Sequence, residues 1–309
     1  MSVITPSRAD ADAGTTSPPV ATGTPQLWID GAFLPADASC LPATTHALHY
    51  GSGVFEGIRS YATDDGGTAV FRLPEHLERM QRGARMLGIA LDVDHVSHIV
   101  LQVLRRNRHR DAYIRPLAWL GMGSMGLDVT ALSQHLMVAT MTPAVHLGGA
   151  SIRLGVSGWR RNPATSLPPL KLCGAYVNSL LAKHEVAARG FEEALFVDAS
   201  GHVVECTGAN VFMVQGDRIT AVQHPDALAG ITAATLLEVT GAQSRAVTLD
   251  ELRDADEVFV CGTAAEVAPV SRLEDRIYAG SKVGREVASL YRRIVRGNAP
   301  AYRHWLTHA

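Results

Sequence analysis

The chain has 309 residues, of which 47% are hydrophobic and 19% charged, and its formal net charge at pH 7 is −2. This composition excludes a disordered or collagenous chain, and the near-neutral balance gives no broad field for nucleic acid or an anionic membrane. The length predicts about two domains, each large enough to bury a core. No apolar run approaches the ~20 residues that a membrane span needs.

Cysteine and histidine form no recognisable pattern. Cys40, Cys173, Cys206 and Cys261 stand far apart and include no C-x-x-C pair. We interpret them as buried thiols of a protein in a reducing compartment, which predicts a cytoplasmic location. Histidine pairs at i,i+3 spacing lack a nearby carboxylate or cysteine to complete a ligand set, so no metal site is predicted.

The first 25 residues are expected to be a disordered tail that activity does not need. Twenty of them are Ala, Thr, Ser, Pro, Gly or Asp, and none is aromatic. Such a segment buries too little apolar surface to offset the entropy of ordering it. It also lacks the apolar core of a secretory signal.

Residues 26–142 are expected to form a small N-terminal α/β domain. Two short strands flank the turn Asp30-Gly31, and a hairpin over 61–73 has a second glycine-rich turn. Apolar residues at three- or four-residue spacing predict a helix from Pro74 that ends near Gly88. The remaining elements of this domain are a helix over 96–107 and strands over 111–121 and 134–142.

Residues 143–149 are the predicted interdomain linker, and 150–309 the predicted large C-terminal domain. Its expected strands are 151–157, 194–198, 202–206, 210–214, 218–222 and 257–261, and its expected helices are 175–189, 232–240 and 281–296. Strands and helices are segregated rather than strictly alternating, which favours an α+β (mixed α/β) fold over a doubly wound sheet. No G-x-G-x-x-G follows a strand, which argues against dinucleotide binding.

Lysine is scarce in this chain. Of the 28 Lys and Arg residues, only Lys171, Lys183 and Lys282 are lysine, which leaves 25 arginines. Lys183 lies in mid-helix and Lys282 begins the last helix, so both are expected at the surface. Lys171 is flanked by apolar residues just before a helix. Partial removal from water lowers the pKa of such an amine and makes it a usable nucleophile or base; the alternative is a snorkelling surface lysine.

A lysine that binds pyridoxal phosphate needs three kinds of neighbour: an acid at the ring nitrogen, backbone N–H groups at the phosphate and a polar group at the ring hydroxyl. Glu205 ends an apolar strand, where a carboxylate must be paired, either with a pyridinium or, at an edge, with an arginine. Helix starts are expected at 230–232 and 262–265. Each is a phosphate site, or else ordinary capping chemistry.

Six motifs resemble those of the fold-type IV pyridoxal-phosphate enzymes (class IV aminotransferases), most closely the branched-chain amino acid aminotransferases. The motifs cover 46–59, 112–117, 171–179, 205–212, 230–232 and 261–266, within a similarity that runs from about Leu27 to Leu273. The resemblance implies the two-domain fold of the D-amino acid aminotransferase type, with pyridoxal 5'-phosphate as cofactor. It also implies a homodimer or larger homo-oligomer, in which a neighbouring subunit completes the active site.

The resemblance assigns a role to each matching position. Lys171 would bind the cofactor covalently and act as the catalytic base, Glu205 would hold the pyridinium nitrogen and Tyr176 the ring hydroxyl. The residues implied at the cofactor phosphate are Arg79, Ile231, Thr232 and Thr263. The residues implied on the substrate side are Tyr50, Phe55, Arg59, Tyr113, Arg115, Thr263 and Ala264.

Within the substrate set, Tyr113 and the backbone of Thr263 and Ala264 would bind the α-carboxylate. Arg115 would bind the distal carboxylate of glutamate or 2-oxoglutarate. Core packing is the alternative for Phe55 and Tyr113. Three departures from the family leave the substrate side chain open: 144–147 replace a Trp-Gly-Ala-Tyr-type run, Ala209 replaces an acid and Ala233 replaces an arginine.

The implied activity is ping-pong transamination between an L-amino acid and 2-oxoglutarate or another 2-oxo acid. The amino acid would have a branched-chain or similar apolar side chain. Two alternatives on the same fold are a D-amino acid or amine transaminase and an enzyme like aminodeoxychorismate lyase. A third is a non-catalytic binding protein. The expected partners are therefore small molecules, with no nucleic acid and no membrane.

Overall fold

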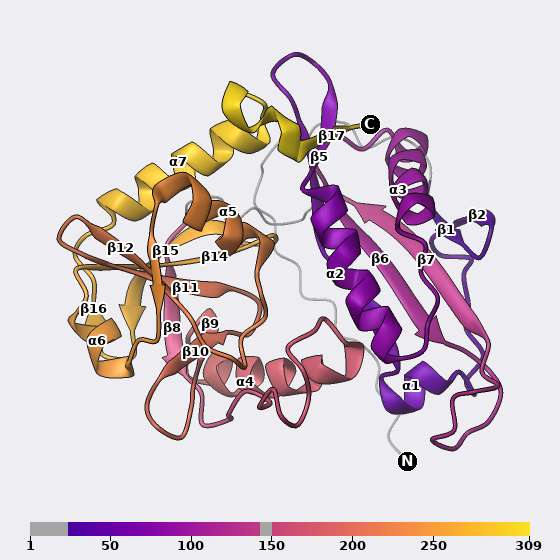
Figure 1. The fold of residues 1–309 in the computed structure, drawn as a ribbon, viewed down its shortest axis with the longest axis horizontal. Helices are drawn as coiled ribbons and strands as arrows, with labels where there is room; N and C mark the ends of the chain where they lie inside the picture. Colours follow the sequence, from indigo (N-terminus) through magenta and orange to yellow (C-terminus); the bar gives the residue numbers. More distant parts are fainter. Residues whose placement is uncertain (1–23, 143–149) are drawn as a thin grey trace, which may run out of the picture.

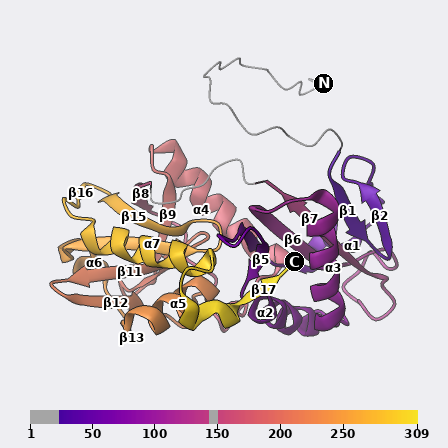
Figure 2. The same ribbon diagram turned by 90° about the horizontal axis from the view of Figure 1, so that it is seen from above.

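The structure is a computed structural model that describes residues 24–142 and 150–309 (Figure 1). The predicted linker, and the predicted tail except for its last two residues, lie outside the described residues. The described chain forms two sheets side by side, each with its own helices (Figures 1 and 2). The predicted mixed α/β fold is therefore confirmed. No helix of the described part is long and apolar enough to cross a membrane.

The first sheet contains eight strands in the described residues, and all of its pairings are antiparallel. Along its main path the order is β17-β5-β4-β6-β7-β1-β2, and β3 pairs with β6. The strands are β1 (Gln26–Ile29), β2 (Ala32–Pro35), β3 (Gly53–Phe55), β4 (Ile58–Ala62), β5 (Thr68–Phe71), β6 (Ala112–Leu120), β7 (Gln134–Met141) and β17 (Leu306–His308). The helices of this half are α1 (His46–Tyr50), α2 (Leu73–Met86) and α3 (Val93–Asn107).

Local chemistry explains the ends of these elements. Asp30 and Gly31 both have positive φ, as a two-residue hairpin turn requires, and they join β1 to β2. Helix α3 begins three residues earlier than predicted because the Asp92 carboxylate accepts hydrogen bonds from the Asp94 and His95 N–H groups. Apolar side chains of α2 and α3, such as Leu77 and Val100, are fully buried in one core cluster with the sheet.

The second sheet contains nine strands in the described residues and is mixed. Its order is β10-β9-β8-β15-β14-β11-β12-β13, and β16 pairs with β15. The strands are β8 (Ile152–Val156), β9 (Glu193–Val197), β10 (Val203–Cys206), β11 (Asn210–Gln215), β12 (Arg218–Val222), β13 (Gln243–Arg245), β14 (Glu257–Gly262), β15 (Glu266–Leu273) and β16 (Arg276–Ile277). The helices are α4 (Tyr176–Ala188), α5 (Ile231–Thr240), α6 (Leu249–Asp254) and α7 (Lys282–Val295), with the 3-10 turns η1 (Cys173–Ala175) and η2 (Pro300–Trp305).

Two expectations are corrected here. The predicted helix start at 262–265 is wrong, because these residues form the tight turn between antiparallel strands β14 and β15, with Gly262 opposite Glu266. The central strand β15 was not predicted. Its residues are extended because they pair with β14, β16 and β8. The prediction of buried thiols is wrong for Cys40, which is exposed, although Cys206 and Cys261 are buried.

The C-terminus returns to the first sheet. After α7 crosses the second sheet, η2 leads to β17, which pairs with β5 (Figure 1). Trp305 anchors this return, since the Arg72 guanidinium lies 3.7 Å from its ring centroid and the Tyr302 ring stacks at 4.7 Å. The last residues of the chain therefore connect the two sheets.

Trp305→Ala is expected to lower the free energy of unfolding by about 3–5 kcal/mol, because it leaves a cavity where a buried indole packs. Urea unfolding of the full chain measures this loss. Trp159→Ala is the matched control, since Trp159 is 49% exposed, whereas Trp305 is 6% exposed. Equal losses in the two variants would contradict an anchoring role.

Candidate active site

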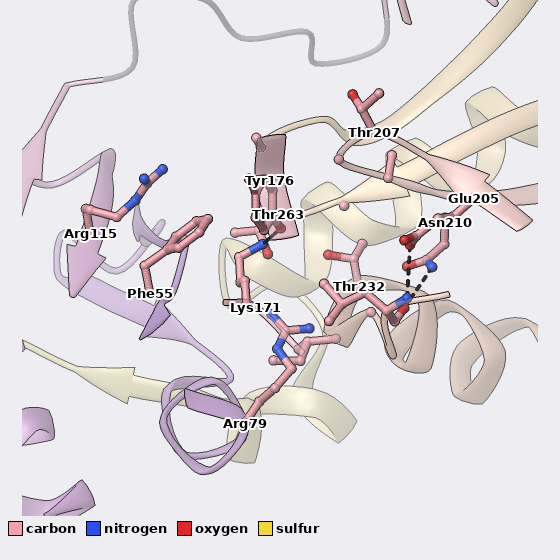
Figure 3. A pocket seen from close by; sticks show the side chains of 18 of the residues that line it. Phe55, Arg79, Arg115, Lys171, Tyr176, Glu205, Thr207, Asn210, Thr232 and Thr263 are labelled. Carbon is pink, nitrogen blue, oxygen red and sulfur yellow. Dashed lines mark hydrogen bonds between the residues drawn. The ribbon is translucent and has the colours of Figure 1, made fainter. Parts of the chain in front are cut away.

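A cavity of about 520 Å³ lies where the two sheets meet, a size typical of small-molecule sites. Of the predicted site residues, eleven line it: Phe55, Arg79, Tyr113, Arg115, Lys171, Tyr176, Glu205, Ile231, Thr232, Thr263 and Ala264. Figure 3 shows that they come from both halves of the chain, with Phe55 and Arg115 on one side of Lys171 and Glu205 and Thr232 on the other. Residues distant in sequence are thus brought to one cavity.

Lys171 is held at the centre by backbone contacts. Its carbonyl accepts a hydrogen bond from Phe55 N–H at 3.2 Å, next to a bridge between Val54 and Leu172. Lys171 Nζ donates to Tyr176 Oη at 2.7 Å. Burial lowers the pKa of the Lys171 amine and raises the pKa of Tyr176 to about 12. The site therefore favours a neutral amine beside a protonated phenol.

Glu205 lies on β10 with its carboxylate buried. Oε1 accepts a hydrogen bond from Arg161 Nε at 2.8 Å, and Oε2 accepts one from Leu228 N–H at 3.1 Å. Burial raises the pKa of Glu205 to about 7, although Arg161 opposes this shift. The interpretation of Glu205 as the partner of an arginine is therefore confirmed, and Glu205 also lines the cavity.

The N-terminus of α5 lines the cavity. The first N–H groups of a helix have no acceptor within it, and Ile231 and Thr232 occupy this first turn against the cavity. The helix start is fixed by Asn210, whose Nδ2 donates to the Leu228 carbonyl at 3.0 Å. Gly230 is required there, because a Cβ would lie 1.9 Å from Asn210 Oδ1.

Arg79 reaches the cavity from α2. Its Nε and Nη2 donate to the Glu56 carboxylate at 2.7 and 2.9 Å, and its Nη1 donates to the Ala229 carbonyl at 2.8 Å. Ala229 precedes Gly230, the N-cap residue of α5. The arginine and the helix N-terminus therefore form one positively polarised end of the cavity.

The opposite end combines aromatic rings with a cation. Arg115 Nη2 donates to Tyr113 Oη at 3.0 Å, and the guanidinium lies 4.6 Å from the Phe55 ring centroid. Tyr113 packs against Gly57, where a Cβ would lie 2.0 Å from the hydroxyl. This end offers apolar contact and a binding group for a carboxylate.

Two predicted substrate residues do not line the cavity. Tyr50 is exposed and its Oη donates to the Met125 carbonyl at 2.8 Å. Arg59 is buried, and its Nη1 donates to Glu266 Oε1 at 2.9 Å. Glu266, at the start of β15, therefore provides its carboxylate partner.

Sequence reasoning missed Arg161 and Glu56. Arg161 lies in the irregular stretch before Lys171, where nothing distinguishes it from the other arginines. Glu56 lies inside the first matched motif, and its full burial was the missing information. Within the described residues, no group of three or more His, Cys, Asp or Glu side chains could hold a metal ion.

The donor set fits pyridoxal 5'-phosphate. Lys171 offers an amine for its aldehyde, Tyr176 a hydroxyl for its ring hydroxyl and Glu205 a carboxylate for its ring nitrogen. The N-terminus of α5, with Arg79 beside it, suits its phosphate. Gly262 lets the backbone approach closely, since a Cβ there would lie 2.9 Å from the Gly208 carbonyl oxygen.

Comparison with known proteins agrees with this arrangement. A family model described as amino-transferase class IV matches residues 53–273. The branched-chain-amino-acid aminotransferase of Pseudomonas aeruginosa is 33% identical over 296 residues, covering 91% of this chain and 96% of that protein.

Two solved structures are similar over nearly the whole chain. The T.th. branched-chain amino acid aminotransferase, complexed with N-(5'-phosphopyridoxyl)-L-glutamate, has a TM-score of 0.88 and 38% identity, covering 92% of this chain and 98% of that one. The branched-chain aminotransferase of the archaeon Thermoproteus uzoniensis, with norvaline, has a TM-score of 0.88 and 33% identity, covering 93% and 99%. The similarity therefore includes both sheets and the cavity between them.

Proposed function

The chain belongs to the class IV aminotransferases, and we propose that it transfers amino groups from an L-amino acid with a branched or similar apolar side chain to 2-oxoglutarate or another 2-oxo acid. Pyridoxal 5'-phosphate is the cofactor. The observation that carries the proposal is the buried Lys171 amine, 2.7 Å from the Tyr176 hydroxyl, in a cavity that Glu205 also lines. The relatives named above, all of them branched-chain aminotransferases, support the substrate class.

The cofactor, when bound, draws electrons from the substrate α-carbon and so weakens its C–H bond. Lys171 has two tasks in this proposal: it anchors the cofactor, and after substrate displaces it, its neutral amine removes the α-proton. The same amine would then deliver this proton to the carbon of the former cofactor aldehyde, and water would release the 2-oxo acid. Burial lowers the pKa of Lys171, which increases the fraction of amine able to act as a base.

Glu205 and Tyr176 fix the charge state around the ring. Glu205 would accept a hydrogen bond from the protonated ring nitrogen, and Arg161 and Leu228 N–H hold its carboxylate in place. Tyr176 would hydrogen-bond the ring hydroxyl, and its own hydroxyl lies 2.7 Å from the Lys171 amine. These residues would position the ring beside the base that moves the proton.

Substrate binding is proposed at the aromatic end of the cavity. Tyr113 and the backbone of Thr263 and Ala264 bind the α-carboxylate, and Phe55 contacts the apolar side chain. Arg115 binds the distal carboxylate of 2-oxoglutarate in the second half-reaction. The phosphopyridoxyl-glutamate ligand of one related structure and the norvaline of another support a pocket that accepts both kinds of side chain.

A donor screen tests this function. With 2-oxoglutarate as acceptor, leucine and valine are expected to give the highest kcat/KM, and aromatic and D-amino acids much lower values. Faster turnover of a D-amino acid or a simple amine would favour the alternative transaminase. Release of pyruvate from aminodeoxychorismate without any acceptor would favour the lyase. Ping-pong kinetics are expected in either transaminase.

A homodimer or larger homo-oligomer is proposed, in the cytoplasm. Exposed apolar side chains on α1, the loop before β7 and α4 support a second copy of the chain as partner, among them Leu48, Met125, Leu127, Val177 and Leu180. Leu180 is 67% exposed and also lines the cavity, so a partner could cover the site there. A monomeric mass at micromolar concentration, with full activity, would contradict this assembly. Cell fractionation tests the location.

A further inference from the structure

Glu56 is a buried carboxylate that takes part in none of the steps above. It lies between β3 and β4, and its side chain is completely inaccessible to solvent. Besides the two bonds from Arg79, the carboxylate accepts hydrogen bonds from His76 Nδ1 at 2.9 Å and from Gly57 N–H at 3.2 Å. Four N–H donors thus bind one carboxylate, although a single cation would be enough to neutralise its charge.

The charges of Glu56 and its two side-chain partners follow from their surroundings. His76 and Arg79 are three residues apart on α2 and therefore share one helix face. Burial lowers the pKa of His76, so Arg79 is the cation of the group. Burial alone raises the pKa of Glu56, but Arg79 and the His76 hydrogen bond outweigh it and hold that pKa at about 2. The pair is therefore ionised at neutral pH.

The donors of Arg79 are divided between two elements. A guanidinium has five N–H donors. Glu56 takes two along the Nε–Nη2 edge, and the Ala229 carbonyl takes one from Nη1. Among the described residues, the printed bonds leave one N–H on each terminal nitrogen without an acceptor, and Arg79 lines the same cavity as Ile231 and Thr232 in the first turn of α5. These are the donors available to an anion held by that helix.

We propose that Glu56 is a positioning residue that sets the guanidinium of Arg79 for the phosphate of the bound cofactor, an inference that rests on the proposed use of pyridoxal phosphate. Glu56 does not touch the cofactor. Its two oxygens hold one edge of the guanidinium, and His76 and Gly57 hold the carboxylate in turn. The remaining edge of the guanidinium is thereby kept at the helix N-terminus.

Two effects of removing the Glu56 charge oppose each other. Glu56→Gln raises the positive potential near the phosphate, which by itself favours binding. The amide, however, places an N–H₂ donor against an arginine donor, so the guanidinium must turn away from its present orientation. The bidentate contact with Glu56 determines how Arg79 presents its other N–H groups. We therefore expect the loss of orientation to outweigh the gain in positive potential and to weaken binding of the phosphate.

The test compares two ligands that differ only in the phosphate. Pyridoxal phosphate and pyridoxal are titrated into the full chain after removal of the cofactor, and binding is followed by absorbance. Glu56→Gln is expected to weaken pyridoxal phosphate binding about tenfold or more and pyridoxal binding less than about twofold. A purely structural defect would weaken both ligands equally.

Two controls separate the positioning role from general damage. Glu257→Gln changes another buried carboxylate, which accepts hydrogen bonds from Val283 and Gly284 N–H groups away from the cavity; neither affinity should change. In an Arg79→Met background, adding Glu56→Gln should cause no further loss of phosphate-dependent affinity. Glu56→Asp keeps the charge on a shorter side chain, and we expect it to lie between wild type and Glu56→Gln.

Equal weakening of both ligands, or unchanged or tighter pyridoxal phosphate binding in Glu56→Gln, would overturn the positioning role. If Glu56→Gln does not fold, the affinities of Glu56→Asp for pyridoxal phosphate and for pyridoxal are compared instead, and the same two outcomes apply. Failure of the wild-type chain to bind pyridoxal phosphate would instead contradict the proposed function itself.

Discussion

Lys171→Ala is expected to lower kcat for transamination by about 10³-fold or more and to remove the visible absorbance that pyridoxal phosphate gives when covalently bound. The change deletes both the covalent anchor and the base that moves the α-proton. No other lysine can replace it, because Lys171 is the one lysine that lines the cavity among the described residues. Steady-state kinetics and an absorbance spectrum of the purified protein measure the two effects.

The other lysines provide matched controls. Lys183 contacts the Glu192 carbonyl and the Glu193 carboxylate at the surface, and Lys282 begins α7. Lys183→Ala and Lys282→Ala should retain both activity and spectrum. Survival of the covalent band in Lys171→Ala would disprove the assignment of the lysine.

Glu205→Gln is expected to lower kcat by about 10²–10³-fold, the typical loss when one preorganised electrostatic partner is removed. An amide cannot hold a proton on the ring nitrogen as a carboxylate does, and the change also leaves the buried Arg161 without its ionic partner. The KM for the amino donor should change much less than kcat. Full activity of Glu205→Ala would contradict the role of this carboxylate at the ring nitrogen, whereas a wild-type chain with neither activity nor a cofactor spectrum would favour the non-catalytic alternative.

The raised pKa of Glu205 predicts that the stability of the chain depends on pH. Burial raises the pKa of Glu205 from 4.5 to about 7 in the cofactor-free chain. Between these values the folded chain keeps a proton that the unfolded chain has lost, so this group lowers the free energy of unfolding as pH rises through that interval. Relative to Glu205→Gln, the cofactor-free wild type should lose stability between about pH 5 and about pH 7.5. If the free energies of unfolding of wild type and Glu205→Gln changed in parallel with pH, the raised pKa of Glu205 would be contradicted.

The chemistry-bearing residues of the site could be predicted from local sequence. Lys171 stands out because lysine is rare and its neighbours are apolar, and Glu205 because a carboxylate at the end of an apolar strand needs a partner. The motif resemblance added Tyr176 and Arg79, and all four line one cavity. Most helices and strands were also predicted, since their periodicity and end signals are local.

What could not be predicted depends on tertiary pairing. Strand β15 and the turn before it form because β15 pairs with β14 and β8. Strand β17 forms because it pairs with β5, which lies far from it in the sequence. The resemblance assigned Arg59 to the substrate side, and nothing in the sequence indicated that Glu266 would pair with it. Arg161 is one of 25 arginines, and only the folded chain selects it as the partner of Glu205.

Mapping the covalent attachment of the cofactor tests the central claim most directly. The purified chain, incubated with pyridoxal phosphate, is reduced with borohydride, digested and analysed by mass spectrometry. The account predicts a phosphopyridoxyl group on the peptide that contains Lys171 and none on the peptides that contain Lys183 or Lys282. Attachment at either of those lysines, or unmodified Lys171 under saturating cofactor, would contradict it.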